Sequence, residues 1–409
     1  MYYCGIDWSD KTLEYHLRNA ESKVLCKGVV AAGVGGMAEL YSKLERHACP
    51  EEIGVAIETC HGAWIQAMLD RGYIIYPVNP KTVERFRQAC SANGVKTDKI
   101  DSKVLSMFLL TFHKENKPLR PDAPEIIKLR ILCQDRLRLT EEHTAKINEL
   151  GAVVKCYYPA FVGLFGRMDS DIALDFLIRY PTQSQFKKLS ERLFRNWLGR
   201  HHYSCPRRID GMLEKLHAPV FGVAEHLQES KKHLIRYLSR SLKMLNAEIA
   251  ERDREINDHL DGLPESDWVR SLPGAGNVLA PSLLACLGRD PERYSSTGEA
   301  RAFMGTAPVT FASGNSCSVH FRRGCWKFAR RTLQLFAEQS RHHCCWAQVF
   351  YEKQRAGGRR HHAALRALAH RWLKILLAMK RTGSCYNEAV YLNDQRRHIL
   401  KIPMLKAAN

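Results

Sequence analysis

Four carboxylates in the first quarter of the chain are its residues best suited to chemistry: Asp7, Glu58, Asp98 and Asp101. The first follows an apolar run at residues 2–6, and the second ends another at 53–57. The other two are three residues apart where a helical pattern begins, so their side chains share one helix face. Convergent carboxylates suit Mg²⁺, and two such ions stabilise the attacking and leaving oxygens of a phosphodiester. The sequence therefore predicts a site with one or two Mg²⁺ ions for phosphoryl transfer.

Ser313 is a second candidate for chemistry. It lies between Ala312 and Gly314 in an expected loop over residues 306–315. A Ser-Gly pair is a turn signal, so these residues alone leave both a turn and a nucleophile open. His320 or Lys327 could assist such a nucleophile. The candidate nucleic-acid ligands follow shortly downstream: Arg322, Arg323, Lys327, Arg330 and Arg331.

Positive charge is concentrated near the C-terminal end of the 409-residue chain. The formal net charge is +19, and residues 318–381 hold 15 Lys and Arg against two acids. Such a block is typical of a protein that binds a phosphate backbone, although a basic helical surface can also serve solubility. The 14 cysteines form no paired framework, and consecutive helical residues at 342–345 cannot all face one zinc ion.

No secretory signal pattern opens the chain, and its apolar runs are too short to span a bilayer. We therefore expect a cytoplasmic protein with no membrane partner.

The elements expected in the first 115 residues would bring the carboxylates together. Three strands (2–7, 13–17 and 24–31) precede a helix at 36–47, a strand at 53–58, a helix at 63–70, a strand at 73–78 and helices at 82–89 and 98–112. This is the order of an RNase H-like α/β domain. In that order Asp7 falls on the first strand, Glu58 on the fourth and the pair Asp98/Asp101 on the last helix, so the predicted fold agrees with the predicted site.

The remaining chain is predicted to be mainly helical. Residues 116–265 contain two long apolar seams, which favour an antiparallel or intermolecular coiled coil or an ordinary helical bundle, with smaller helices at 171–179 and 185–198. A C-terminal domain at 266–385 opens with a Pro-Gly-x-Gly turn at 273–276, which resembles a helix-hairpin-helix but also suits any tight turn. Basic helices are expected at 327–339 and 362–380, and residues 386–409 form a tail.

The chain resembles the DEDD transposases of the Piv/MooV type, which are insertion-sequence recombinases with a RuvC-like N-terminal domain. The resemblance starts with Gly5-Ile6-Asp7-Trp8-Ser9, Glu58 and Lys96-Thr97-Asp98-Lys99-Ile100-Asp101. It continues through residues 180–182, 272–276, 307–308, 313–314 and 322–324, so it covers nearly the whole chain. The helical section at 161–229 departs from it, being longer than the compact linker of that family.

The resemblance implies roles for these residues. Asp7, Glu58, Asp98 and Asp101 would be metal ligands, and Ser313 the nucleophile that forms a phosphoserine link to DNA. Members of this group are guided by a structured non-coding RNA that pairs with donor and target DNA. They assemble as oligomers through the coiled coil, so a homodimer or homotetramer is expected. The resemblance also implies a bacterial, nucleoid-associated protein. The carboxylates would then assist a serine attack within a composite site.

The leading hypothesis is thus a transposase or site-specific DNA recombinase. The alternative is a RuvC-like, structure-specific DNA endonuclease that uses the carboxylates alone and in which Ser313 is structural. A nucleic-acid-binding protein without enzymatic activity is a third hypothesis, against which the complete set of carboxylates argues.

Overall fold

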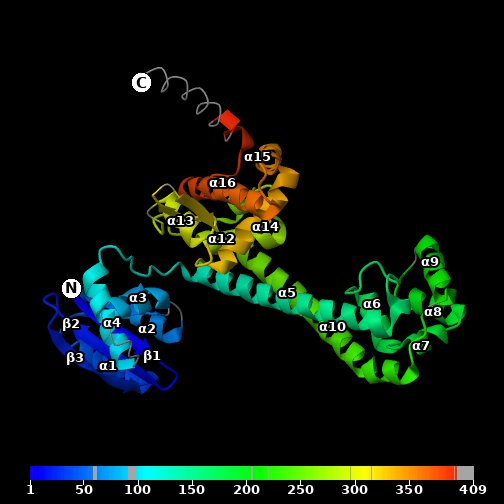
Figure 1. The fold of residues 1–409 in the computed structure, drawn as a ribbon, viewed down its shortest axis with the longest axis horizontal. Coiled ribbons are helices and arrows are strands. Elements are labelled where there is room, and N and C mark those ends of the chain that lie inside the picture. Colours follow the sequence, from blue (N-terminus) through cyan, green and yellow to red (C-terminus); the bar gives the residue numbers. More distant parts are fainter. Residues whose placement is uncertain are drawn as a thin grey trace. The chain divides into compact units, whose positions relative to one another are not determined.

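The computed structural model describes two compact units, Met1–Pro121 and Asp122–Asn409 (Figure 1). The structure describes residues 1–58, 62–90, 98–203, 206–219, 221–294, 296–314, 316–390 and 392–393. Within these ranges it does not describe the side chains of residues 90, 98–100 and 206. No helix in these ranges is long and apolar enough to cross a membrane. The predicted three-domain division and tail stay predictions.

A five-stranded sheet forms the centre of the first unit, in the order β3-β2-β1-β4-β5. Its strands are β1 (Tyr2–Trp8), β2 (Thr12–Arg18), β3 (Val24–Ala31), β4 (Ile53–Ile57) and β5 (Ile74–Pro77). The first three pair antiparallel, while β4 runs parallel to both β1 and β5. The predicted order of strands and helices, and a mixed α/β N-terminal region, are thereby confirmed.

Helices cover both faces of this sheet. On one face, α1 (Val34–Leu44) and α2 (Ala63–Asp70) pack over the side chains of Cys4 and Ile6. On the other, α4 (Asp98–Phe112), with α3 (Pro80–Cys90) beside it, packs over Tyr3. Because side chains alternate along a strand, residues 3, 5 and 7 of β1 belong to the α4 face.

Two long helices form an antiparallel pair in the second unit: α5 (Pro124–Tyr157) and α10 (Glu225–Asp261) (Figure 1). Arg136 Nε donates to Asp253 Oδ1 across the pair at 2.8 Å, and Lys146 Nζ lies near Tyr237. Most of the predicted seam is buried, including Leu129, Leu150, Leu238 and Leu242, with Leu139, Ile147 and Ile249 only partly covered. The helices thus pair within one chain, and the homo-oligomer stays a prediction.

A compact helical module stands between these two helices in sequence. Its elements are α6 (Asp171–Arg179), α7 (Gln183–Lys187), α8 (Glu191–Arg200) and α9 (Pro206–His217). Fully buried phenylalanines, with Phe176 among them, fill its core and cover one end of the α5–α10 pair. The structure divides the helical pattern expected at 185–198 because the Ser190 side chain accepts from Leu193 N and starts a new helix.

The C-terminal module covers the other end of the pair. It contains α11 (Ser266–Arg270), α12 (Gly276–Leu287), α13 (Thr297–Phe303), α14 (Lys327–His343), α15 (Cys345–Ala356) and α16 (His361–Thr382). Fully buried Trp372 lies at its centre and donates to Ser340 Oγ at 2.7 Å. The predicted mainly helical C-terminal part is confirmed.

The turn at residues 273–276 has a packing role. Gly274 has a φ of +74°, and a Cβ there would lie 3.1 Å from the carbonyl oxygen of Gln339 in α14. Glycine is therefore required both by backbone conformation and by the approach of α14. The helix-hairpin-helix-like element stays a prediction.

Candidate active site

Asp7 and Glu58 lie at the ends of two adjacent parallel strands. In the register of β1 and β4, Ile6 is opposite Ile57, and each carboxylate is the next residue. Ile6 and Ile57 both point into the core beneath α1 and α2, so alternation directs the two acids to the α4 face. Asp7 is half-buried and Glu58 is exposed.

Helix α4 brings the other two carboxylates toward the same edge. Tyr3, near the start of β1, lies beside His113 just past the end of α4, whereas Gly5 lies against Ser102 and Ser106. The helix therefore runs opposite to β1, and its first turn, with Asp98 and Asp101, is directed toward the Asp7 end. The Asp98 side chain lies outside the described residues.

Gly5 permits this close approach. A Cβ on Gly5 would lie 2.1 Å from the carbonyl oxygen of Ser102 and 2.5 Å from the amide nitrogen of Ser106. The α4 backbone therefore rests directly on β1. The contact between Ser102 and Gly5 is one residue from Asp101 along α4 and two residues from Asp7 along β1. A second anchor is buried Arg18, whose Nε donates to Ser106 Oγ at 2.9 Å.

We predict that Gly5→Ala destabilises the protein by about 1–3 kcal/mol or more, because overpacking must push α4 away from the sheet. Urea unfolding measures this change. Gly35→Ala is the matched control, since Gly35 is an exposed helical glycine, and a Cβ added to it would meet no atom within 4 Å. That control should be neutral or stabilising. Equal stability of the two variants would contradict the close packing.

Asp101 is engaged with a cation in this structure. Arg87 Nη1, on α3, donates to Asp101 Oδ1 at 2.8 Å, and both side chains are largely buried. A metal ion held by Asp101 would therefore compete with, or share the carboxylate with, this guanidinium. The sequence did not reveal the pair, because it forms only where α3 packs beside α4.

The residues present fit Mg²⁺ by the chemistry of their donors, since Asp7, Glu58 and Asp101 all supply carboxylate oxygens near the ends of β1 and β4. Among the described side chains, however, no three acids, histidines or cysteines are grouped closely enough to hold one ion. The Asp98 side chain is not among those described.

Glu14 is an acid that sequence reasoning missed. It is directly opposite Asp7 in the antiparallel register of β1 and β2, and it is half-buried. Its neighbours Leu13 and Tyr15 enter the core under α1, so Glu14 shares the α4 face with Asp7. The alternation of apolar and polar residues in 13–18 was the available signal. Such cross-strand neighbours have Cβ atoms about 4.5–5.5 Å apart.

The sequence predicts a loop at Ser313, but the structure places this residue at the end of a β-hairpin. The hairpin joins β6 (Val309–Ser313) to β7 (Ser316–His320), with Ser313 opposite Ser316. The β-branched and aromatic residues at 309–311 explain the strand. Ser313 is exposed beside Gly314, whose φ is +54°, so its hydroxyl is accessible to a large substrate.

His320 is placed away from Ser313. It lies four residues beyond Ser316 along β7, about 13 Å at the usual rise per residue. Its Nε2 is 3.0 Å from Ser318 Oγ. Assistance of Ser313 by His320 is therefore not supported by this geometry.

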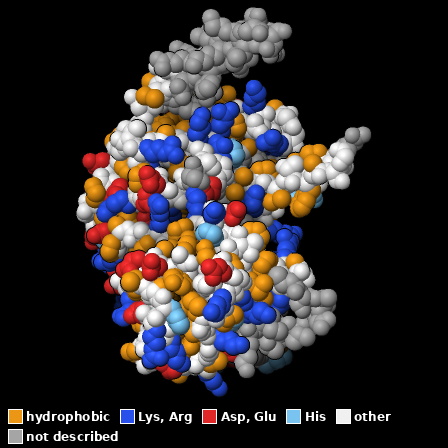
Figure 2. Space-filling model, turned by 90° about the vertical axis from the view of Figure 1, so that its left-hand side faces the viewer, with side chains coloured by type: hydrophobic (Ala, Val, Ile, Leu, Met, Phe, Trp, Pro, Cys, Tyr) orange, Lys and Arg blue, Asp and Glu red, His pale blue; other side chains and the backbone are white. Residues whose placement is uncertain are grey.

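The five predicted nucleic-acid ligands differ in their surroundings. Arg323 and Lys327 are exposed. Arg322 Nε donates to the Ala307 carbonyl at 3.1 Å, and Arg330 Nη1 donates to the Arg322 carbonyl at 3.1 Å. Arg331 pairs with Glu141 on α5. Basic side chains form several groups over the upper part of the face shown in Figure 2, at the height of the C-terminal helices.

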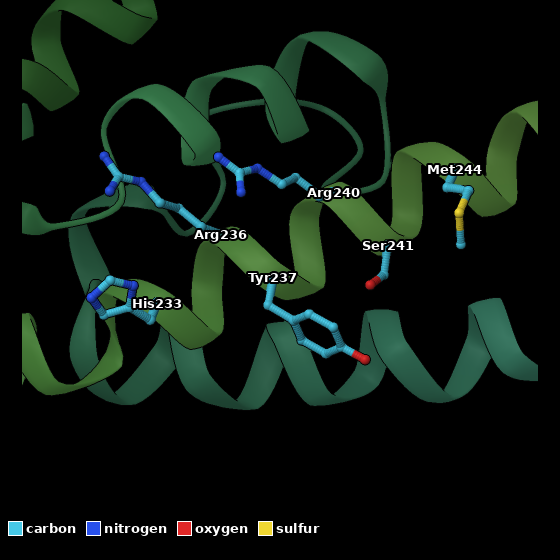
Figure 3. A pocket seen from close by; sticks show the side chains of 6 residues that line it. All are labelled: His233, Arg236, Tyr237, Arg240, Ser241 and Met244. Carbon is cyan, nitrogen blue, oxygen red and sulfur yellow. The ribbon is translucent and has the colours of Figure 1, made fainter.

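A shallow hollow of about 470 Å³ lies on α10 (Figure 3). It is lined by His233, Arg236, Tyr237, Arg240, Ser241 and Met244. These residues follow one another at alternating intervals of three and one along a single helix, as residues on one helix face do. Arg236 Nε already donates to the Ile178 carbonyl at 3.1 Å. Without a carboxylate among its lining residues, this hollow does not match the predicted metal chemistry.

Comparison with known proteins identifies two matching segments. Residues 4–159, which include all four acids, match a family of transposases named for the DEDD type of IS110. Residues 266–352, which include Ser313, match the transposase IS116/IS110/IS902 family.

Similar proteins occur in several bacteria. A proposed mini-circle transposase for IS117 from Streptomyces coelicolor is 25% identical over 420 aligned positions, covering 99% of this chain and 98% of that protein. The 44.8 kDa protein of insertion element IS116 from Streptomyces clavuligerus is 26% identical and covers 79% of this chain and 80% of its own length. The 42 kDa protein of IS900 from Mycobacterium paratuberculosis is 24% identical, with 95% and 97% covered.

Proposed function

Because the chain is a transposase of the IS110/IS116 family of insertion sequences, an enzyme that cuts and rejoins DNA, we propose that it does so through a phosphodiester link to Ser313. We further propose that Asp7, Glu58, Asp98 and Asp101 hold Mg²⁺ for this reaction. The observation that carries the proposal is the register of β1 and β4. It sets Asp7 beside Glu58 on the face where α4 begins.

The chemistry balances without an external energy source. Ser313 Oγ loses its proton and attacks phosphorus, a new P–O bond to serine forms, and the bond to the leaving sugar oxygen breaks. That oxygen takes up a proton. A hydroxyl of the new partner strand then attacks the phosphoserine, and Ser313 Oγ leaves and is protonated again. One phosphodiester thus replaces another, whereas attack by water would leave a broken strand.

Different residues of the chain would have different roles in this reaction. Bound Mg²⁺ would polarise the scissile phosphate and stabilise charge on the leaving oxygen. The carboxylates orient that ion, and Arg87 fixes the position of the Asp101 carboxylate. The exposed hairpin end allows Ser313 to reach an extended DNA backbone, while the exposed Arg323 and Lys327 attract phosphates.

The function is tested with DNA that carries the ends of the element and a labelled target. Mg²⁺-dependent appearance of joined donor–target strands is the expected result. Cleavage without any joined product, under conditions where both DNAs are bound, would instead support the endonuclease that uses the carboxylates alone.

We also propose that a structured guide RNA binds this protein, on the basis of the family resemblance and the 15 Lys and Arg at residues 318–381. Sequencing of RNA co-purified with the chain should return one predominant transcript. A charge-matched, unrelated basic protein purified in parallel is the control. Recovery of the same RNA mixture from both proteins would contradict the proposal.

A further inference from the structure

A basic cavity of about 730 Å³ lies in the C-terminal module, between the base of the β6–β7 hairpin and helices α15 and α16. Four arginines line it, Arg322, Arg359, Arg366 and Arg371, together with two histidines. None of the described residues that line it is acidic. Its volume is in the range of ligand-binding cavities.

The cations in and beside this cavity repel one another. Burial lowers the pKa of His370 to about 4, and the nearby Arg301 and Arg371 contribute to that shift. Burial and Arg330 lower the pKa of Arg366, and burial and Arg371 lower that of Arg301. Nε of Arg301 is buried without a hydrogen-bond partner in the described chain. The protein therefore maintains several incompletely neutralised cations at one place, which is unfavourable unless an anion binds.

Aromatic rings accompany these cations. The guanidinium groups of Arg366 and Arg330 lie 4.8 and 4.7 Å from the centre of the Phe321 ring, and that of Arg371 lies 5.4 Å from Phe350. Phe321 is 45% exposed, and both rings line the cavity. Arginines with accessible aromatic rings are the usual surface for single strands, because the guanidinium groups bind phosphates and the rings contact sugars and bases.

The cavity is connected to the proposed nucleophile by a single β-strand, β7. Residues 319–322 line it, and β7 leads from there to Ser316, the register partner of Ser313. The distance along the strand is about 13 Å. A DNA strand in the cavity would thus be held a few nucleotides from a phosphate at Ser313.

We propose that this cavity binds a single DNA strand, with its backbone phosphates on Arg366 and Arg371, next to the phosphodiester that reacts. The choice of DNA rests on the proposed function, since the nucleophile lies on the same hairpin. Arg366 and Arg371 are positioning residues for the strand, while Arg322 and Arg330 maintain the hairpin base through their carbonyl contacts.

The test uses the full-length protein with Arg366→Gln and Arg371→Gln, singly and combined. Lys374→Gln is the matched control, because Lys374 is exposed on the same helix three residues past Arg371 and does not line the cavity. Fluorescence anisotropy with labelled single-stranded DNA, duplex DNA and RNA of one sequence gives the affinities over a series of salt concentrations.

The double variant should bind single-stranded DNA about tenfold or more weakly, and the slope of log K against log salt should fall in magnitude by about one to two. The control should change little. The Tm of the DNA-free double variant should stay the same or rise, because repulsion is relieved.

Three results would overturn the proposal. The first is an unchanged affinity for DNA. The second is a loss of affinity confined to RNA, which would assign the cavity to RNA. The third is a fall in Tm that parallels the loss of DNA affinity, which would show that the two arginines have a structural role. Ser313→Ala should bind DNA like the wild type. If Ser313→Ala still transfers strands while the cavity variants lose DNA, the proposed function fails and the cavity proposal stands.

Discussion

Ser313→Ala is expected to abolish both strand transfer and the covalent protein–DNA adduct. The variant removes the only atom proposed to form the phosphodiester link, so the rate of strand transfer should fall by at least about 10³-fold. A labelled DNA substrate and a denaturing gel detect the adduct, and joined products measure transfer. DNA affinity should be unchanged, because Ser313 is an exposed side chain at the end of the hairpin.

Ser318→Ala is the matched control for this result. Ser318 is also an exposed hairpin serine, but it is opposite Phe311, two residues farther along β7 than Ser316, and its hydroxyl lies 3.0 Å from His320 Nε2. The control should retain both the adduct and strand transfer. If Ser318→Ala lost the adduct while Ser313→Ala kept it, the nucleophile would be reassigned. If Ser313→Ala transferred strands normally, covalent catalysis by this serine would be excluded.

The N-terminal sheet was predictable because its signals are local. Alternation and short apolar runs predicted every strand there, and helices at 63–70 and 98–112 were predicted to the residue. Since Asp7 and Glu58 each end such a run, their place at strand ends followed directly. Their common face did require the structure, because β4 is buried on both faces and only the observed register sets Ile6 opposite Ile57.

Contacts between distant segments were not predictable. Nothing near Gly5 in the sequence indicates that the α4 backbone at Ser102 rests on it, and the Arg87–Asp101 ion pair depends on how α3 packs beside α4. The basic cavity combines residues from 305 to 371, which join only through the packing of three elements. The sequence predicts a loop at Ser313 because Gly314 and Asn315 are strong turn residues and the strand before them is short.

Asp7→Asn is expected to eliminate metal-dependent strand cleavage and transfer while DNA and RNA binding persist. The substitution keeps the shape of a half-buried side chain and removes the negative charge that a divalent cation requires. A fall of about 10²-fold or more in the rate is expected, as for the loss of a group that stabilises developing charge. Asp10→Asn is the control, since Asp10 is exposed in the turn after β1 and is not one of the four proposed metal ligands.

Metal binding supplies a readout that is independent of catalysis. Millimolar Mg²⁺ or Mn²⁺ should raise the Tm of the wild type and of Asp10→Asn, because a ligand that binds only the folded state stabilises it. The same ions should raise the Tm of Asp7→Asn much less. Asp101→Asn should behave like Asp7→Asn, with an additional loss of stability because Arg87 would lose its carboxylate partner.

If Asp7→Asn kept both the metal-induced shift in Tm and full cleavage, the metal site would have to lie elsewhere in the chain. If it kept the shift but lost cleavage, Asp7 would act on the DNA without holding the ion, and Glu14, opposite it in the sheet, would become the next residue to test.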